Sequence, residues 1–298
     1  LNMFLLKNYS CKICDKKIYF YQYKPSGSKK GSKVVVCNKC CLVQSVFKNV
    51  NNIKKPSLSA NADWGNVRHG KKLRLDNQKK LVNFENYLKG NVLDIGSNRG
   101  DFIKFASEFN KVKNIYAVEP DKKIIEYENI KKFNVINKPI EDVKFDSNLK
   151  FNFIYCSHTL EHLNEFRILF NLFDKHLHED GKIFIDIPNI KFIENKSVVE
   201  EFFIDKHTFH FSKLSFKNLI NYFNFEIVLE LEDGFNLIYV IKNNYKENKQ
   251  NKIMYNHESK IAKKNIKKYK KYLKINRSNL ESIVSNELKK IINQKKLV

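Results

Sequence analysis

Two pairs of cysteines with the same spacing lie near the start of the 298-residue chain. Cys11 and Cys14 form one C-x2-C pair, Cys37 and Cys40 form the other, and 22 residues separate the pairs. Each such turn can point two thiolates at one tetrahedral ion, and a small module with little core of its own gains folding energy from that ion. The spacing predicts a zinc-binding module over residues 1–60. The zinc should be structural, because four protein ligands leave no position open for a substrate.

The two other cysteines are expected in apolar surroundings. Cys41 is followed by Leu42 and Val43, which predicts that it packs inward, and Cys156 ends an apolar strand. Five of the six cysteines fall in the first 41 residues, and such clustering favours metal binding in a reducing compartment over disulfides. No apolar stretch approaches the roughly 18 to 20 residues that cross a bilayer. We therefore expect a cytoplasmic chain.

A second group of residues predicts a cofactor site. Gly96-Ser-Asn-Arg-Gly100 follows the apolar stretch 91–95 and precedes a helical pattern, so its glycines let the backbone approach a ligand beside free N–H groups. A dinucleotide fingerprint would need a further glycine, but Asn98 stands there. Asp94 would repel a pyrophosphate and suits the sulfonium and amino-acid end of S-adenosylmethionine. We expect Ser97 to belong to the same site.

Acidic and polar residues at the ends of later strands extend this site. Glu119, followed by Pro120, lies 19 residues beyond Gly100, about where an acid accepts both ribose hydroxyls. After the fourth strand, Ser157 and His158 are expected to line the methionine end of the cofactor. His162 is expected to pack or to cap inside the following helix.

Two histidines between the fifth strand and the next helix are candidate catalytic groups. A histidine titrates near neutral pH, so His207 is the candidate base, with His210 beside it and Asp205 as an orienting carboxylate. Two histidines three apart also resemble metal ligands, but the sequence near them offers no evident third ligand. His207 is therefore interpreted as the proton acceptor.

Alternating strand and helix patterns must position these groups. Such alternation predicts a parallel, doubly wound α/β sheet with its ligand at the carboxyl ends of the strands. The helix 214–223 precedes two strands close enough to pair as an antiparallel hairpin. The expected strands are 91–95, 114–118, 134–137, 151–156, 182–187, 226–231 and 237–241; the helices between them are 101–106, 122–129 and 160–177. A lead-in helix is expected within 61–90, where Leu81, Phe84 and Leu88 recur at helical spacing.

The net charge of +23 is the strongest indication of a polyanionic partner, but the scarcity of arginine among the basic residues weakens that interpretation. Only five of the 55 basic residues are arginine, the residue that reads phosphates with a bidentate fork. Residues 243–298 hold 16 basic and 4 acidic residues with apolar residues at threes and fours. We interpret this tail as amphipathic helices that pack on the core or pair in a homodimer, with an anion-binding or membrane-surface arm as the alternative.

Together these motifs resemble the class I S-adenosylmethionine-dependent methyltransferases over residues 91–242. The loop from Asp94 to Gly100 is similar to their first motif, and Glu119 to their ribose acid. The resemblance implies a Rossmann-like methyltransferase domain that binds S-adenosylmethionine. It also implies an adenine-edge segment at Pro139-Ile140-Glu141-Asp142 and a post-strand-four segment from Tyr155 to His162.

A narrower resemblance is to the deoxysugar C-methyltransferases that carry an N-terminal zinc module. It is carried by the cysteine pairs, by Gln44 after them, and by the Ile-Gly-Ser-Asn-x-Gly loop, in which Arg99 replaces the usual aspartate. That family's histidine base follows a glutamate; His207 matches the base, but Lys206 stands where the glutamate would be. This departure favours the broader set of surface-polysaccharide methyltransferases that act on sugar hydroxyls. The resemblance implies a sugar or glycan substrate.

Two other functions remain open at this point. An RNA methyltransferase could hold phosphates with the zinc module and the basic tail. Against base N-methylation, the segment after strand four reads Cys156-Ser-His-Thr159 instead of Asn/Asp-Pro-Pro-aromatic. A non-enzymatic protein whose domain only binds S-adenosylmethionine is the second alternative.

Overall fold

The computed structural model describes residues 10–15, 33–37, 40–46, 68–122, 133–190, 207–233 and 235–245. Among these residues, no helix combines the length and the apolar character that crossing a membrane requires. The predicted helix 122–129 and the predicted tail 243–298 fall almost entirely outside the described residues, as does Asp205.

A seven-stranded sheet forms the centre of the molecule, in the order β5-β4-β3-β6-β7-β10-β9. The strands from β5 to β7 pair in parallel, whereas β10 pairs antiparallel with both β7 and β9. The predicted mostly parallel sheet with a C-terminal antiparallel hairpin is thus confirmed. Its strands are β3 (Gly90–Ile95), β4 (Val112–Val118), β5 (Phe133–Ile136), β6 (Phe151–Ser157), β7 (Leu177–Pro188), β9 (Phe225–Glu232) and β10 (Asn236–Asn243).

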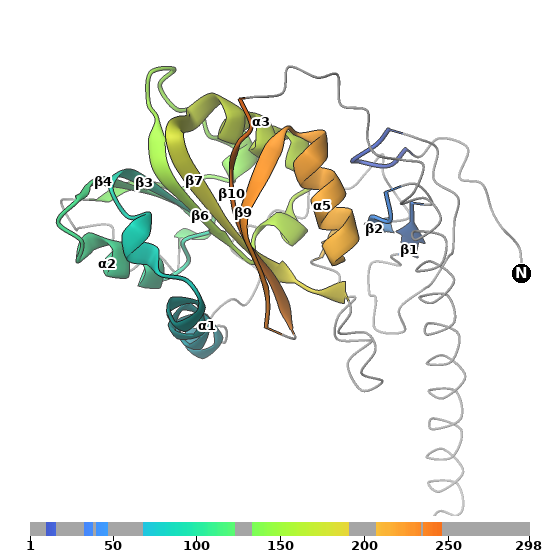
Figure 1. The fold of residues 1–298 in the computed structure, drawn as a ribbon, viewed down its shortest axis with the longest axis horizontal. Coiled ribbons are helices and arrows are strands. Elements are labelled where there is room, and N and C mark those ends of the chain that lie inside the picture. The colour runs from blue at the N-terminus through green and yellow to red at the C-terminus, as the bar shows by residue number, and fades with distance from the viewer. Residues whose placement is uncertain are drawn as a thin grey trace, which may run out of the picture.

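Helices cover both faces of this sheet (Figure 1). Helices α1 (Arg68–Leu81) and α2 (Asp101–Ser107) contribute to one apolar cluster, and α3 (Phe166–His176) and α5 (Lys213–Tyr222) contribute to the other. The central strand β6 is buried on both sides: from Phe153 to Cys156, successive residues alternate between the two clusters. Such two-sided burial explains why its sequence reads as a continuous apolar run.

The lead-in segment is shorter as a helix than the apolar spacing predicts. Helix α1 ends at Leu81, which is 45% exposed, and Phe84 begins the short 3-10 helix η2 (Phe84–Asn86). Asn83 breaks the pattern because its side chain accepts a hydrogen bond from the backbone N–H of Glu85, as an N-cap does. Phe84 and Leu88 are nevertheless buried.

The predicted helix 160–177 is wrong in its first turn. The chain forms the 3-10 helix η5 (Leu160–His162) and then α3 begins at Phe166, after Glu165 accepts a hydrogen bond from the N–H of Arg167. The break leaves η5 at the carboxyl edge of β6. His162 therefore lies outside the long helix in which it was expected to pack.

A second, three-stranded sheet joins the cysteine-containing segment to the rest of the chain. Strands β1 (Lys33–Val36) and β2 (Val43–Val46) form an antiparallel pair, and β8 (Phe209–His210) pairs antiparallel with β2. Strand β8 belongs to the segment between β7 and α5, which carries the candidate base. The sequence does not predict this third strand, because two residues carry no alternation pattern.

Candidate functional site

The loop after β3 adopts the left-handed backbone that its glycines permit. Gly96 has φ +75°, Asn98 has φ +50° and Gly100 has φ +80°. A Cβ at Gly96 would lie 2.3 Å from the side-chain oxygen of Thr159, so the loop packs directly against the segment after β6. Gly100 is the N-cap of α2, whose first N–H groups therefore face the loop.

A pocket lies beside this loop. Among the predicted cofactor residues it contains Asp94, Gly96, Ser97 and Ser157, and it is completed by Arg74, Leu75, Asp101, Phe102 and Tyr155. The sequence did not single out Arg74, which comes from α1, or Tyr155 as a pocket residue.

A buried hydrogen-bond network, which we call the pocket floor, connects Tyr155 and Ser157 of the pocket lining to Gln78 and Asp186. Gln78 of α1 accepts a hydrogen bond from the Tyr155 hydroxyl at 2.5 Å, and its amide nitrogen donates to Asp186 Oδ2 at 2.5 Å and to Ser157 Oγ at 3.1 Å. Burial raises the pKa of Asp186 and of Tyr155. The sequence analysis did not identify Asp186 as a site residue, although an acidic residue within the apolar segment 183–187 indicates a buried polar group.

Glu119 connects the end of β4 to the glycine loop. Its Oε2 accepts a hydrogen bond from the backbone N–H of Asn98 at 2.8 Å, and its Oε1 accepts one from the N–H of Asp121 at 3.0 Å. Pro120 lies between Glu119 and Asp121 in the chain, at the carboxyl edge of the sheet. The carboxylate is thus held beside the loop, where the sequence analysis expects the ribose.

The predicted adenine-edge segment follows β5 at the same edge. Ile140 and Glu141 lie in the 3-10 helix η4 (Ile140–Asp142), and the Ile140 side chain is buried in the core.

If Glu119 accepts the ribose hydroxyls, as the sequence predicts, replacing it with alanine should weaken S-adenosylmethionine binding by about 1.5 to 3 kcal/mol, because a charge-assisted hydrogen bond would be lost. Titration calorimetry on the full chain measures this change, and Glu141→Ala is the matched carboxylate control, for which we expect a smaller loss. Unchanged affinity of the Glu119 variant would remove the ribose assignment.

Beyond the pocket, His158 connects the network to a second cluster. Its backbone N–H donates to the Asp186 carbonyl at 2.8 Å, and its ring Nε2 lies 3.7 Å from Asp186 Oδ1 and 3.0 Å from Asn236 Oδ1. On the other side of the ring, Nδ1 lies 3.4 Å from Glu161 Oε1. His158 thus spans the distance between the pocket floor and Glu161.

Glu161 is the centre of a group of histidines. Its carboxylate is 1% exposed, and its Oε1 lies 3.8 Å from His162 Nε2. The His162 and His207 rings stand 4.7 Å apart between centroids. Burial alone would raise the pKa of Glu161, but His158 and the positive charges that His162 and His207 can carry hold it well below its usual range. The carboxylate is therefore ionised at neutral pH.

His210 occupies a different place from His207. It is buried in β8, and its Nε2 lies 2.8 Å from the hydroxyl of Ser45 in β2. Burial, and then the charge of His207, lower the pKa of His210 far below its usual value, so the ring is neutral. This placement favours a role in holding β8 to β2 within the three-stranded sheet over contact with a methyl acceptor.

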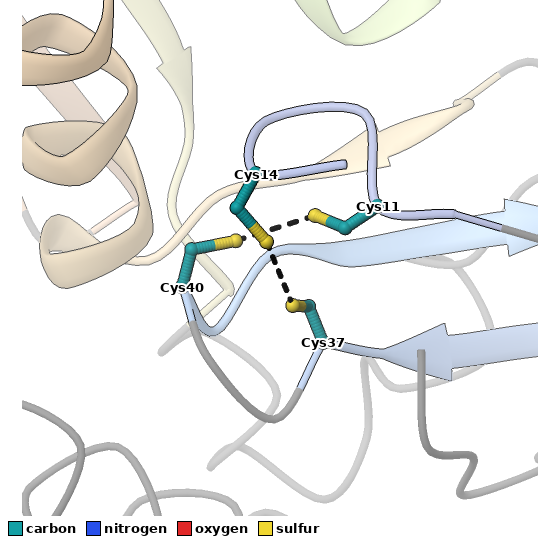
Figure 2. A group of neighbouring side chains, drawn as sticks. All are labelled: Cys11, Cys14, Cys37 and Cys40. Carbon is teal, nitrogen blue, oxygen red and sulfur yellow. Dashed lines mark hydrogen bonds between the residues drawn. The ribbon is translucent and has the colours of Figure 1, made fainter. Parts of the chain in front are cut away.

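The four predicted metal-ligating cysteines come together in one cluster (Figure 2). All four are buried and their sulfur atoms lie within 4.8 Å of one another. The distances between Sγ atoms are 3.3 Å for Cys11 and Cys40 and 3.6 Å for Cys14 and Cys37. Cys41, which follows Cys40 and has φ +63°, is also buried. Cys156 is buried in β6, as part of the hydrophobic core.

The donor set fits a zinc ion. Neighbouring thiols raise the pKa of Cys11 and of Cys40, whereas the hydrogen bond from Cys11 lowers the pKa of Cys37. Four thiols packed this closely resist full ionisation unless a cation compensates them, and a coordinating cation deprotonates thiols outright. Cys11, Cys14, Cys37 and Cys40 would hold the ion, which supplies folding energy to the module.

Polar contacts fix the cysteine cluster against the larger domain. Lys12 forms an ion pair with Glu165 at 2.9 Å, and Arg167 reaches Asp15 at 2.7 Å and the carbonyl of Ile13 at 3.2 Å. On the other side, the Asn218 amide of α5 donates to the Cys40 carbonyl at 3.3 Å.

The sheet order, the glycine loop and the pocket at the strands' carboxyl edge define a methyltransferase-type α/β fold. A family model described as a methyltransferase domain matches residues 68–230. This match covers more than half of the chain, so the chain belongs to this methyltransferase family. It is an enzyme of the S-adenosylmethionine-dependent class.

Solved structures with a similar fold are distant in sequence. An S-adenosylmethionine-dependent methyltransferase of Clostridium acetobutylicum is 15% identical, with a TM-score of 0.44 over 58% of this chain and 91% of that one. One from Leishmania major is 17% identical, with a TM-score of 0.45 over 59% and 73%. The 1,6-didemethyltoxoflavin N1-methyltransferase of Burkholderia thailandensis is 13% identical, with a TM-score of 0.45 over 61% and 85%. A search of curated proteins found no match.

Proposed function

We propose that this enzyme transfers a methyl group from S-adenosylmethionine to a sugar, either nucleotide-linked or part of a surface-glycan precursor. The observation that carries the proposal is the position of His207. It stands next to Glu161 and His162, and His158 connects this group to the floor of the pocket beside the glycine loop. Methyl transfer needs the cofactor and a group that activates the acceptor side by side.

The reaction is an in-line displacement at the methyl carbon. The acceptor atom forms the new bond to that carbon, and the bond from carbon to sulfur breaks with its electron pair going to sulfur. S-adenosylhomocysteine is the second product, and the acceptor's proton is lost. Because the cofactor supplies the leaving group, the protein's task is to position the acceptor and to assist loss of this proton. His207 is the proposed activating residue, with Asp205 near it in sequence.

Cofactor binding is assigned to the residues at the carboxyl edge of the sheet. In this proposal Asp94 and Ser157 face the methionine end with His158, Glu119 and Pro120 face the ribose, and Ile140 and Glu141 face the adenine. The loop residues that complete the site are Gly96, Ser97, Asn98 and Gly100. Zinc is proposed for the cysteine cluster, with a structural role.

The sugar substrate is supported by the resemblance in sequence to sugar methyltransferases with a zinc module. His207 matches the base of that family, whereas Lys206 replaces its glutamate. This replacement favours a hydroxyl oxygen over a carbon as the acceptor atom. The proposed domains are a zinc module at 1–60, a lead-in segment at 61–90, the methyltransferase domain at 91–242 and a helical tail at 243–298.

The full chain, incubated with methyl-labelled S-adenosylmethionine and a panel of nucleotide-linked sugars, should transfer label to a sugar, and mass spectrometry identifies the product. Bulk RNA is the parallel substrate, because the charge of +23 favours it as the alternative acceptor. A tail that binds RNA would give an affinity that falls steeply with salt and is lost on deleting residues 246–298. Labelled RNA together with unlabelled sugars would overturn the proposal.

A further inference from the structure

Another part of the fold places two further potential metal ligands beside His207, whereas His210 is not part of the group. Glu161, His162 and His207 each offer one ligand atom, and these atoms all lie within 4.8 Å of one another. Glu161 and His162 come from η5 after β6, 45 residues or more before His207 in the chain. The backbone N–H of Thr208 donates to the Glu161 carbonyl at 2.8 Å, so a direct hydrogen bond holds the two segments together.

Among the described residues, no side chain makes a short hydrogen bond to the Glu161 carboxylate. The Glu161 carboxylate is buried, and its Oε1 lies 3.4 Å from His158 Nδ1 and 3.8 Å from His162 Nε2. Charge-assisted hydrogen bonds are shorter, about 2.7 to 2.9 Å. Burying a carboxylate is costly unless it is well paired or coordinates a metal. A dication between the carboxylate and the two imidazoles would provide that compensation.

We propose that Glu161, His162 and His207 bind one divalent transition-metal cation of the Mn²⁺, Fe²⁺, Co²⁺ or Zn²⁺ type. Two imidazoles and one carboxylate suit these cations better than Mg²⁺ or Ca²⁺, which prefer oxygen ligands. The site is distinct from the cysteine cluster, whose soft thiolate ligands select zinc. It differs from a closed structural site because three protein ligands leave coordination positions open.

The open positions suggest which acceptor the enzyme takes. This step rests on the proposed function: a sugar that presents two adjacent oxygens, as in a vicinal diol or a hydroxyl beside a carbonyl, can bind the cation through both. A bound hydroxyl is more acidic, so its proton passes to solvent water and its oxygen attacks the methyl carbon. His207 then activates the acceptor as a ligand, and its ring nitrogen holds the cation instead of taking the proton.

Electron paramagnetic resonance with Mn²⁺ tests the site directly, because Mn²⁺ favours nitrogen and oxygen ligands over thiolates. The full chain is first given one equivalent of zinc for the cysteines and is then titrated with Mn²⁺. We expect one bound Mn²⁺ per chain. The separate variants Glu161→Gln and His162→Asn should each weaken binding by about tenfold or more.

His178→Asn is the matched control. His178 lies at the start of β7, whereas His158 is hydrogen-bonded to Asp186 near the end of that strand, so this variant should leave Mn²⁺ binding unchanged. Absence of bound Mn²⁺ in the wild-type chain would overturn the proposal, as would equal affinity in all variants. Binding of S-adenosylmethionine is measured in the same samples. Sugar methylation that persists without Mn²⁺ binding would refute the cation site and leave the proposed function standing.

Discussion

Replacing His207 with asparagine should lower kcat about 10²- to 10⁴-fold on a sugar acceptor. This is the usual contribution to the rate of a group that assists removal of a proton from the acceptor. Affinity for S-adenosylmethionine should change little, because His207 is separated from the pocket floor by His158 and Glu161. Steady-state kinetics together with calorimetric titration of the cofactor make this measurement. A lowered kcat with intact cofactor binding identifies an acceptor-side residue.

The matched control for this prediction is His210→Asn. His210 is buried in β8 against Ser45 of the neighbouring strand β2, so its replacement should lower kcat less. Full activity of the His207 variant on a nucleotide-linked sugar would remove His207 from the reaction. A product with the methyl group on carbon would reverse our preference for oxygen, since that preference rests on Lys206 in place of a glutamate.

Local patterns account for the parts of the site that the sequence predicts. The glycine loop is recognisable because a strand, a turn with left-handed positions and a helix follow one another within a few residues. The cysteine ligands are recognisable because each pair closes its own turn. The antiparallel hairpin is recognisable because β9 and β10 are separated by only a short turn. In each case the pattern that can be recognised lies within a short stretch of the chain, even where, as for the cysteines, the two stretches then come together.

The acceptor side depends on contacts between distant segments, and for this reason it was only partly predictable. Glu161 and His162 meet His207 because the chain breaks between η5 and α3, where the sequence suggests one continuous helix. Similarly, Gln78 reaches Asp186 across more than one hundred residues. No periodicity in a single segment encodes such a contact.

The joining of the cysteine module to the His207 segment has the same origin. Strand β8 has two residues, yet it completes the sheet of β1 and β2. The backbone N–H of Ser45 also donates to the Thr208 carbonyl at 2.8 Å. The backbone N–H of Thr208 in turn donates to the Glu161 carbonyl. The residue after His207 is therefore hydrogen-bonded both to the cysteine module and to η5. A structural metal in the module can therefore influence a segment that it does not touch.

Loss of the cysteine-bound metal should consequently lower turnover without removing cofactor binding. We expect one zinc per chain in protein purified without chelator, and a large loss of that zinc in Cys37→Ser, because a structural site depends on all four ligands. Residues 1–60 should then loosen while the methyltransferase core stays folded. Once β2 no longer supports β8, His207 loses its fixed position, and a displacement of about 1 Å can cost about 10²-fold in rate.

Metal analysis, hydrogen exchange and turnover on the same samples distinguish this coupling from general unfolding. Cys41→Ser is the matched control, since Cys41 is buried beside the cluster but is not one of the four ligands, and it should retain one zinc per chain. Protection of β3 and β6 in the Cys37→Ser variant should match the wild type, because neither strand pairs with the module. Wild-type protein without zinc would refute the metal assignment. A zinc-free variant that keeps full turnover would instead show that the position of His207 does not depend on the module, and that the hydrogen bond from Thr208 to Glu161 suffices to hold it.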